Sequence, residues 1–503
     1  MFHRITGRGL CLAIFGLAGA VAAQTPSAAK APPLSDETQV CIECHMQVSP
    51  GIVEDWRKSK HAKTTVADAM KVPLLSRAVS SKAVPDALMN VAVGCFECHG
   101  LNPEKHKDHF EHFEIGINVV VTPPDCAVCH AVEAEEFAGS KKAMAHVNLA
   151  KNPVFDSLVN ASVGTRTLHE GRLVHEVPTT AVKNDTCFAC HGSEVTVKGM
   201  KTVTGLNGQK AEIPDLDGWP NQGAGRLNPD GSRGACSACH TRHEFSIETA
   251  RKPHTCSQCH KGPDLPAYEV WSESKHGNLY FSQGDSWNFS HVPWQPGKDF
   301  AAPTCATCHM SLLAKEDEKT HELTALVPRT HDLGSRLWVR IFGLPYSHPQ
   351  PKSGDTTTIR NADGQPLPTT LAGVPAAEHL IDAAEQTKRR DVMGQVCRSC
   401  HTSDVIDGHF EKLDRTIAEA DRMVKTSTAL MERIWAAGGA DRKNLFDEEA
   451  EMKWTDAWLK YANSIRYASA MGGPNYASFE NGWAALNAVV LELDRLARAA
   501  EKK

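Results

Sequence analysis

The pattern of apolar and polar residues divides the chain into two parts. Before residue 410, apolar positions recur at helical spacing only in short pieces, such as 51–69 and 131–148, separated by loops rich in Gly, Pro, Asn and Asp. From Phe410 onward the helical period continues over long stretches. One face carries Leu413, Ile417, Val424, Met431 and Ile434, and another carries Leu486, Val489, Val490, Leu493 and Leu496. With glycine breaks at 438–439 and 472–473, this pattern predicts three long helices packed as a bundle.

Eight copies of the pattern Cys-x-x-Cys-His account for the chemistry of the first part. With 17 cysteines and 25 histidines in 503 residues, chance would give only about 0.03 copies. This spelling is the attachment signal for a c-type haem: the cysteines form thioethers to the porphyrin, and the histidine becomes the proximal ligand of the iron. Zinc sites would not place a histidine after the second cysteine every time. The sequence therefore predicts eight c-type haems, at Cys41/Cys44/His45, Cys95/Cys98/His99, Cys126/Cys129/His130, Cys187/Cys190/His191, Cys236/Cys239/His240, Cys256/Cys259/His260, Cys305/Cys308/His309 and Cys397/Cys400/His401.

The remaining cysteine, Cys11, lies in an N-terminal apolar run, so no cysteine pair is left for a disulfide. The run, 10–23, follows Arg4 and Arg8 and ends in Val-Ala-Ala, which is typical of a secretory signal cleaved before Gln24. A membrane anchor is the alternative, but the run is shorter than the roughly 20 residues that span a bilayer. We expect a periplasmic protein. Its net charge of -6 does not point to nucleic acid.

Eight haems in 503 residues leave too little chain for ordinary cores around each cofactor. The porphyrins must take the place of many buried aliphatic side chains, which explains the weak periodicity before residue 410. We expect a mainly α protein: a signal peptide (1–23), a multihaem cytochrome c body with little regular sheet (24–408) and a C-terminal bundle of long helices (409–503).

The longest loop between motifs is 192–235. Its second half, DLDGWPNQGAGRLNPDGSRGA, has neither a helical nor a strand period. We interpret it as a surface insertion; the alternative is a lid or channel wall beside the haem at Cys187.

Seventeen histidines remain after the eight proximal ones. A second axial histidine makes a haem low-spin and closed to substrate. The candidates for this distal position are His61, His109 or His112, His146, His243, His276, His321 and His331. For each, the alternative is an ordinary surface histidine. From these residues alone the protein is either an electron conduit or an enzyme with one open haem.

The run CSACHTRHEFS, followed by RKP and the next CSQCH within residues 236–260, resembles the octahaem hydroxylamine oxidoreductase family. The segments SKHGNL (274–279), APTCATCHM (302–310), KTHEL (319–323) and GW (482–483) agree with it. The resemblance implies that the haem of the fourth motif is five-coordinate and catalytic. It also implies that the other seven are bis-histidine haems and that the C-terminal helices build a homotrimer.

Two positions depart from the family. Its oxidising members carry a tyrosine, four residues before the tryptophan of the Gly-Trp pair, that crosslinks to the catalytic haem of an adjacent subunit. Phe479 stands there in this chain, and Tyr476 could substitute only if the turn after Pro474 shifts. The family's active-site Asp-His pair aligns with Asp264 and Leu265, so the acid remains and the histidine is gone.

The resemblance therefore implies a reductase that converts nitrite, and hydroxylamine, to ammonium at the fourth haem. His191 would be the proximal ligand, Asp264 the proton donor, and a quinol-linked or small cytochrome donor the source of electrons. One alternative is oxidation of hydroxylamine or hydrazine, and another is a non-catalytic electron-transfer protein. A third is an octahaem sulfite or tetrathionate reductase, which the TRHEFS block disfavours.

Overall fold

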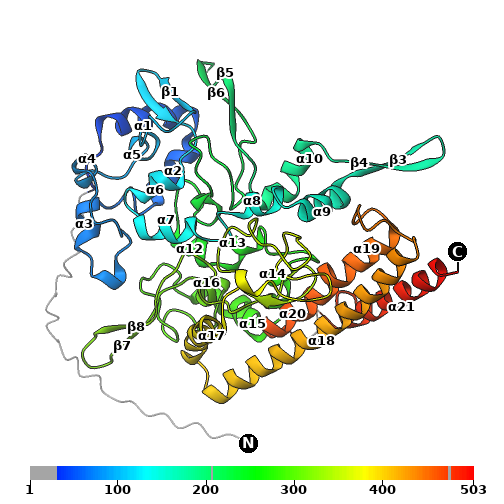
Figure 1. The fold of residues 1–503 in the computed structure, drawn as a ribbon. Helices are drawn as coiled ribbons and strands as arrows, with labels where there is room; N and C mark the ends of the chain where they lie inside the picture. Colours follow the sequence, from blue (N-terminus) through cyan, green and yellow to red (C-terminus); the bar gives the residue numbers. More distant parts are fainter. Residues whose placement is uncertain (1–30, 206–207, 474–476, 503) are drawn as a thin grey trace, which may run out of the picture. The chain divides into compact units, whose positions relative to one another are not determined.

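Helices of mostly one to three turns build the part of the chain that carries the motifs (Figure 1). The computed structural model describes residues 31–205, 208–473 and 477–502. The short helices are α1 (Asp36–Val48), α2 (Pro50–Lys58), α3 (Val66–Lys71), α4 (Asp86–Met89), α5 (Phe96–His99), α6 (Pro123–Ala127), α7 (Ala131–Ala138), α8 (Ala145–Ala150), α9 (Pro153–Val163), α10 (Thr180–Asp185), α11 (Cys187–His191), α12 (Ile247–Arg251), α13 (Pro253–Ser257), α14 (Ala267–Ser272), α15 (Lys275–Gln283), α16 (Cys305–His309) and α17 (Ala383–Arg398). Single 3-10 turns are η1 (Leu74–Ser76), η2 (Cys236–Ala238), η3 (Gly284–Ser286) and η4 (Ala377–His379).

The predicted helices over 51–69 and 131–148 are each interrupted. Between α2 and α3 the Ser59 hydroxyl accepts the Ala62 N–H at 3.1 Å, and between α7 and α8 the Ser140 hydroxyl accepts the Ala143 N–H at 3.2 Å. A serine that caps the next turn competes with continuation of the helix. The apolar period ran across both breaks, so it did not reveal them.

Regular sheet is limited, in the described residues, to five antiparallel pairs of strands. They are β1 (His109–His112) with β2 (Ile115–Asn118), β3 (Thr165–His169) with β4 (Arg172–Glu176), β5 (Thr196–Thr204) with β6 (Lys210–Asp217), β7 (Leu313–Glu316) with β8 (Leu323–Val327), and β9 (Val339–Arg340) with β10 (His348–Pro349). The β5–β6 hairpin corrects the expectation of an unstructured loop over 192–235. A bulge at 197–199 interrupts its pairing, which hides the strand period in the sequence.

Long helices form the C-terminal region: α18 (Ser403–Ala436), then α19 (Glu449–Thr455), the π-helical turn η5 (Asp456–Tyr461) and α20 (Ala462–Met471) in one continuous run, and α21 (Trp483–Ala500). Helix α18 packs against α20 and α21, and Figure 1 shows α18 and α21 side by side. The breaks fall at Gly438 and Gly472, both with a φ of 70° that favours glycine. The expectation of a mainly α protein with a C-terminal long-helix bundle is confirmed. The domain boundary at 408–409 stays a prediction and falls inside α18.

The bundle has a conventional apolar core. Met431 and Leu486 are fully buried, with Trp454 and Trp458 between the helices. Trp454 Nε1 donates to the Thr428 hydroxyl at 2.9 Å, so the buried indole keeps a hydrogen bond. Val270 of α14 belongs to the same core, which joins the bundle to the part that carries the motifs.

In the described residues no helix is long and apolar enough to cross a membrane. The predicted signal peptide and Cys11 lie outside the described residues.

Leu493→Ala should lower the free energy of unfolding by about 2 to 5 kcal/mol, because Leu493 is fully buried and the smaller side chain leaves a cavity. The measurement is urea unfolding followed by the helical circular dichroism. Leu491→Ala on the same helix is the control: Leu491 is 72% exposed, so its replacement should change stability by no more than about 0.5 kcal/mol. Equal effects of the two substitutions would contradict this description of the bundle.

Candidate functional site

Each motif occupies one turn of helix. Positions i, i+3 and i+4 share a helix face, so the two cysteines and the histidine point the same way. In the second, third, fifth, sixth and eighth motifs the histidine N–H donates to the carbonyl of the first cysteine at 2.8 to 3.0 Å. The other three motifs lie within α1, α11 and α16. Every motif therefore presents two sulfurs and an imidazole on one side, as attachment of a c-type haem requires.

Several proximal histidines are held in the orientation that frees Nε2 for iron. His99 Nδ1 donates to the Asn118 carbonyl at 2.7 Å, and His130 Nδ1 donates to the Ala78 carbonyl at 3.1 Å. His45 Nδ1 lies 2.7 Å from the Ser49 hydroxyl. A partner on Nδ1 fixes the ring and leaves the other nitrogen for a metal.

Four motifs face a second histidine at the separation that a shared iron demands. When two imidazoles bind the same iron from opposite sides, each at about 2 Å, their ring centres lie about 6 Å apart. The observed pairs, with their centroid separations, are His45–His112 (6.4 Å), His61–His130 (6.2 Å), His240–His331 (6.5 Å) and His276–His401 (6.1 Å). The first, third, fifth and eighth motifs are thus shaped for bis-histidine haems.

Burial keeps these rings in the neutral form that binds iron. It lowers the pKa of His61, His240 and His331 to about 4 in each case, and neighbouring histidines lower each pKa further. Burial likewise lowers the pKa of His243 to about 4, with His99 of the second motif close enough to contribute.

Three other distal candidates have different partners. His109 Nδ1 lies 2.8 Å from the Asn118 side-chain oxygen. His321 is exposed and pairs with Glu316 at 2.9 Å. His146 donates from Nδ1 to the Gly192 carbonyl at 2.5 Å and packs on Phe188, so its ring lies against the helix of the fourth motif. The structure does not bring these three opposite a proximal histidine in the chain segments it describes.

Contacts between cysteines give the order of the motifs in space. Thiols of the first and second, third and fifth, fourth and sixth, and sixth and seventh motifs lie next to one another, as the pairs Cys41–Cys95, Cys126–Cys236, Cys190–Cys259 and Cys256–Cys305. Electrostatic neighbours add Cys98–Cys129, Cys239–Cys256 and Cys308–Cys397. Because each cysteine holds a porphyrin edge, the haems would form one row from the first to the eighth motif, with the fourth attached at the sixth.

Three predicted attachment residues, Cys44, Cys187 and Cys400, do not appear among these pairs. Cys44 is half-buried and Cys400 is exposed, and the Cys400 sulfur lies 3.9 Å from the hydroxyl of the adjacent Ser399.

Cys44 and Cys400 lie in the motifs at the two ends of the row. They belong to the first and eighth motifs, which have a neighbouring motif on one side only. Each of these motifs turns its first cysteine, Cys41 or Cys397, toward that neighbour. Cys44 and Cys400 then lie at the outer ends of the row, and thioether attachment through them stays a prediction.

The segment after the fourth motif folds back against it. The Ala224 N–H donates to the Cys190 carbonyl, and the Asn221 amide donates to the Phe188 carbonyl, both at 3.1 Å. Gly192 has a φ of 95°, and a side chain there would overlap the backbone of Arg226. Residues 221–226 therefore form a wall of the fourth motif, which corrects the interpretation of 192–235 as a surface insertion.

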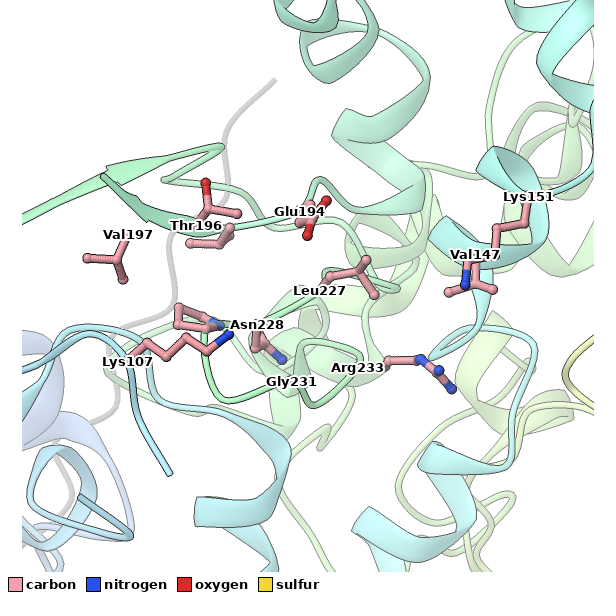
Figure 2. Close-up of a pocket in the computed structure, with 12 residues that line it drawn as sticks. Lys107, Val147, Lys151, Glu194, Thr196, Val197, Leu227, Asn228, Gly231 and Arg233 are labelled. Carbon is pink, nitrogen blue, oxygen red and sulfur yellow. The ribbon is translucent and has the colours of Figure 1, made fainter. Parts of the chain in front are cut away.

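A cavity of about 400 Å³ lies between residues 227–233, the start of β5 and α8 (Figure 2). Lys107, Lys151 and Arg233 line it together with Glu194 and apolar residues of 195–197. It contains no motif residue and no residue of 221–226, so it is not a haem cradle.

Asp264 lies beside the fourth motif, as the resemblance implies. Its charge acts on Cys187, Cys190 and Tyr467, and Asn463 of α20 donates to its backbone carbonyl at 3.4 Å. Solvent reaches the side chain, yet the protein atoms around it raise the pKa of the carboxyl, and nearby Glu269 adds to the effect. A carboxyl with a raised pKa holds its proton closer to neutral pH, as a proton donor must.

No sequence pattern pointed to two further groups in this region. Arg340 acts electrostatically on His191 and on Tyr467. His348 faces Arg340 across the β9–β10 pair, is 3% exposed and donates from Nδ1 to the Pro349 carbonyl at 2.7 Å. Its Nε2 has no hydrogen-bond partner among the described atoms. No local motif marks these residues, because only the tertiary fold brings them together.

Two family models match parts of the chain. Residues 229–330 match the family described as "seven times multi-haem cytochrome CxxCH", and residues 40–115 match cytochrome c554 and c-prime. A solved structure described as a hypothetical multiheme protein is 40% identical with a TM-score of 0.87, covering 94% of this chain and 97% of that one.

Two relatives come from Kuenenia stuttgartiensis. A probable nitrite reductase-hydroxylamine oxidoreductase fusion protein is 25% identical over 403 residues, which are 79% of this chain but only 38% of the fusion protein. The reducing HAO-like protein complex has the same fold, with a TM-score of 0.60 at 18% identity, covering 93% of this chain and 86% of that one. The chain belongs to the multihaem cytochromes c and is similar to members named as hydroxylamine oxidoreductase-like (HAO-like).

In this multihaem cytochrome, His331→Ala should open the fifth haem, because His331 is the ring that faces His240. The reduced variant should bind one more carbon monoxide per chain than the unaltered protein, measured by optical titration. The exposed His321, also a distal candidate, provides the control. His321→Ala should leave the carbon monoxide count unchanged, and an increase with this variant would contradict the pairing.

Proposed function

We propose that this protein reduces nitrite, with hydroxylamine as intermediate or further substrate, to ammonium at the haem of the fourth motif. The proposal rests on the ionisable carboxyl of Asp264, which lies beside Cys187 and Cys190 of the fourth motif. It also rests on His191 of that motif, which makes no imidazole ring pair in the described residues. The relationship to a protein named as a nitrite reductase-hydroxylamine oxidoreductase fusion supports it.

The reaction consumes six electrons and eight protons for each nitrite and releases ammonium and two waters. A bound haem would supply the open coordination site and pass on electrons delivered along the row of motifs. The reductant is an external donor, either quinol-linked or a small cytochrome. The protein itself must therefore orient the iron ligand and deliver protons to the departing oxygens.

His191 and Asp264 fit these two tasks. The imidazole of His191 lies beside the backbone of Ala145, and the protein atoms packed around it lower its pKa to about 4. Asp264 has the raised pKa of a general acid and is open to solvent, so it can take up another proton after each transfer. The positive charge of Arg340 near His191 favours an anionic substrate such as nitrite.

Phe479 supports the reductive direction. In the oxidising members of the family a tyrosine bonds to the porphyrin, and a phenyl ring has no phenolic oxygen with which to do so. The Phe479 side chain is 79% exposed, and Tyr476 lies outside the described residues. Without that bond the fourth porphyrin keeps its ordinary conjugation.

We further propose a periplasmic homotrimer. Apolar residues are exposed on the β3–β4 hairpin, which extends away from the neighbouring helices in Figure 1, and at Leu491 on α21. Leu168 and Leu173 on the hairpin are 76% and 64% exposed. Patches of this kind are typical of surfaces that contact another subunit.

Two activities compete with this proposal: oxidation of hydroxylamine or hydrazine, and electron transfer without catalysis. The purified protein should convert nitrite and hydroxylamine to ammonium with reduced viologen as donor. Brisk hydroxylamine oxidation with cytochrome c as acceptor, alongside negligible nitrite reduction, would overturn the reductive assignment.

Asp264→Asn should lower the rate of ammonium formation by about 10²- to 10⁴-fold at unchanged haem content, because the amide cannot donate the proton. Since only the protonated acid donates, the unaltered rate should fall as the pH rises through the raised pKa of Asp264, and the variant should lose this dependence. The exposed Glu318 provides a control, because Glu318→Gln should leave the rate unchanged. If the Asp264→Asn variant remained active, Asp264 would not be the proton donor.

A further inference from the structure

The sixth motif has an unexpected partner. The ammonium nitrogen of Lys142 donates to His260 Nε2 at 2.5 Å. Nε2 is the atom through which the proximal histidine of a c-type haem binds iron. The side chain of Lys142 thus reaches the position that the distal ligand of this haem would approach.

The sixth motif differs in this respect from the four motifs with facing imidazoles. In the described part of the chain, no histidine ring pairs with His260. The charge of Lys142 lowers the pKa of His260 most, followed by burial and by the charges of His309 and His191. His309 and His191 belong to the seventh and fourth motifs, where each serves its own haem. Lys142 is therefore the nitrogen base that the fold brings to His260.

The backbone around Lys142 is fixed, while its side chain can adjust. Ser140, Ala143 and Met144 are buried, and the Ser140 hydroxyl accepts the Ala143 N–H at 3.2 Å. Lys141 points elsewhere and donates to the Gln350 side-chain oxygen at 2.6 Å. The four-carbon stem of a lysine allows its nitrogen to withdraw far enough to admit an iron between itself and Nε2.

The Lys142 nitrogen lies among side chains of four haem motifs. Its charge acts on the imidazoles of His191 and His309 and on the thiols of Cys190, Cys239 and Cys256. Only a neutral amine binds iron, so the Lys142 proton passes to solvent when the iron–nitrogen bond forms.

We propose that Lys142 is the distal axial ligand of the sixth haem, which is then a histidine/lysine haem and not a bis-histidine one. Two nitrogen ligands keep this haem low-spin and closed to substrate. It remains an electron-transfer centre at the junction where the fourth motif joins the row.

The test is spectroscopic and does not depend on nitrite reduction. Near-infrared magnetic circular dichroism of the ferric protein separates histidine/lysine from bis-histidine haems. The unaltered protein should show one histidine/lysine haem per chain. A spectrum in which every low-spin haem is bis-histidine would overturn the proposal.

Lys142→Ala should abolish the histidine/lysine signal, and its reduced form should bind one additional carbon monoxide per chain. Lys142→His should convert the signal to the bis-histidine type and stay closed to carbon monoxide, which keeps the test decisive if the alanine variant fails to assemble. Lys141→Ala, at the neighbouring lysine, should leave the spectrum unchanged. A histidine/lysine signal that survives in Lys142→Ala, or that is lost in Lys141→Ala, would refute the assignment.

Discussion

The structure depends on the requirement that two side chains meet across one iron. That requirement sets a separation of about 6 Å between facing imidazoles, and four pairs satisfy it with segments that are distant in sequence, such as His240 with His331 and His276 with His401. Once both histidines of a pair bind the iron, they would hold their two chain segments together as firmly as an apolar contact does. The chain can therefore hold together with short helices and small hairpins in its first part.

The C-terminal helices contribute most residues of the largest apolar core in the described part of the chain, and there the sequence was most informative. The long apolar period and the glycines at 438 and 472 were enough to predict the helices of the bundle. The haem motifs were equally clear, because attachment needs a fixed local spacing. Both signals are local, and neither depends on how distant segments meet.

Tertiary pairing explains what the sequence could not settle. His109 and His112 belong to the same strand, yet only His112 faces His45. His321 looked as suitable as His331 but is exposed beside Glu316. Lys142 and His348 carry no motif at all, and the wall formed by 221–226 was hidden in a segment without any period. In each case the deciding partner comes from a remote part of the chain.

Catalysis at the fourth motif requires that its haem has a free axial position, while the irons of the other haems have two axial ligands. Quantitative electron paramagnetic resonance of the ferric holoprotein, with and without nitrite, tests this requirement. We predict one high-spin iron per chain beside low-spin irons, with nitrite perturbing the high-spin signal alone. A uniformly low-spin spectrum that does not respond to nitrite would contradict the proposed reaction and identify the protein as an electron conduit.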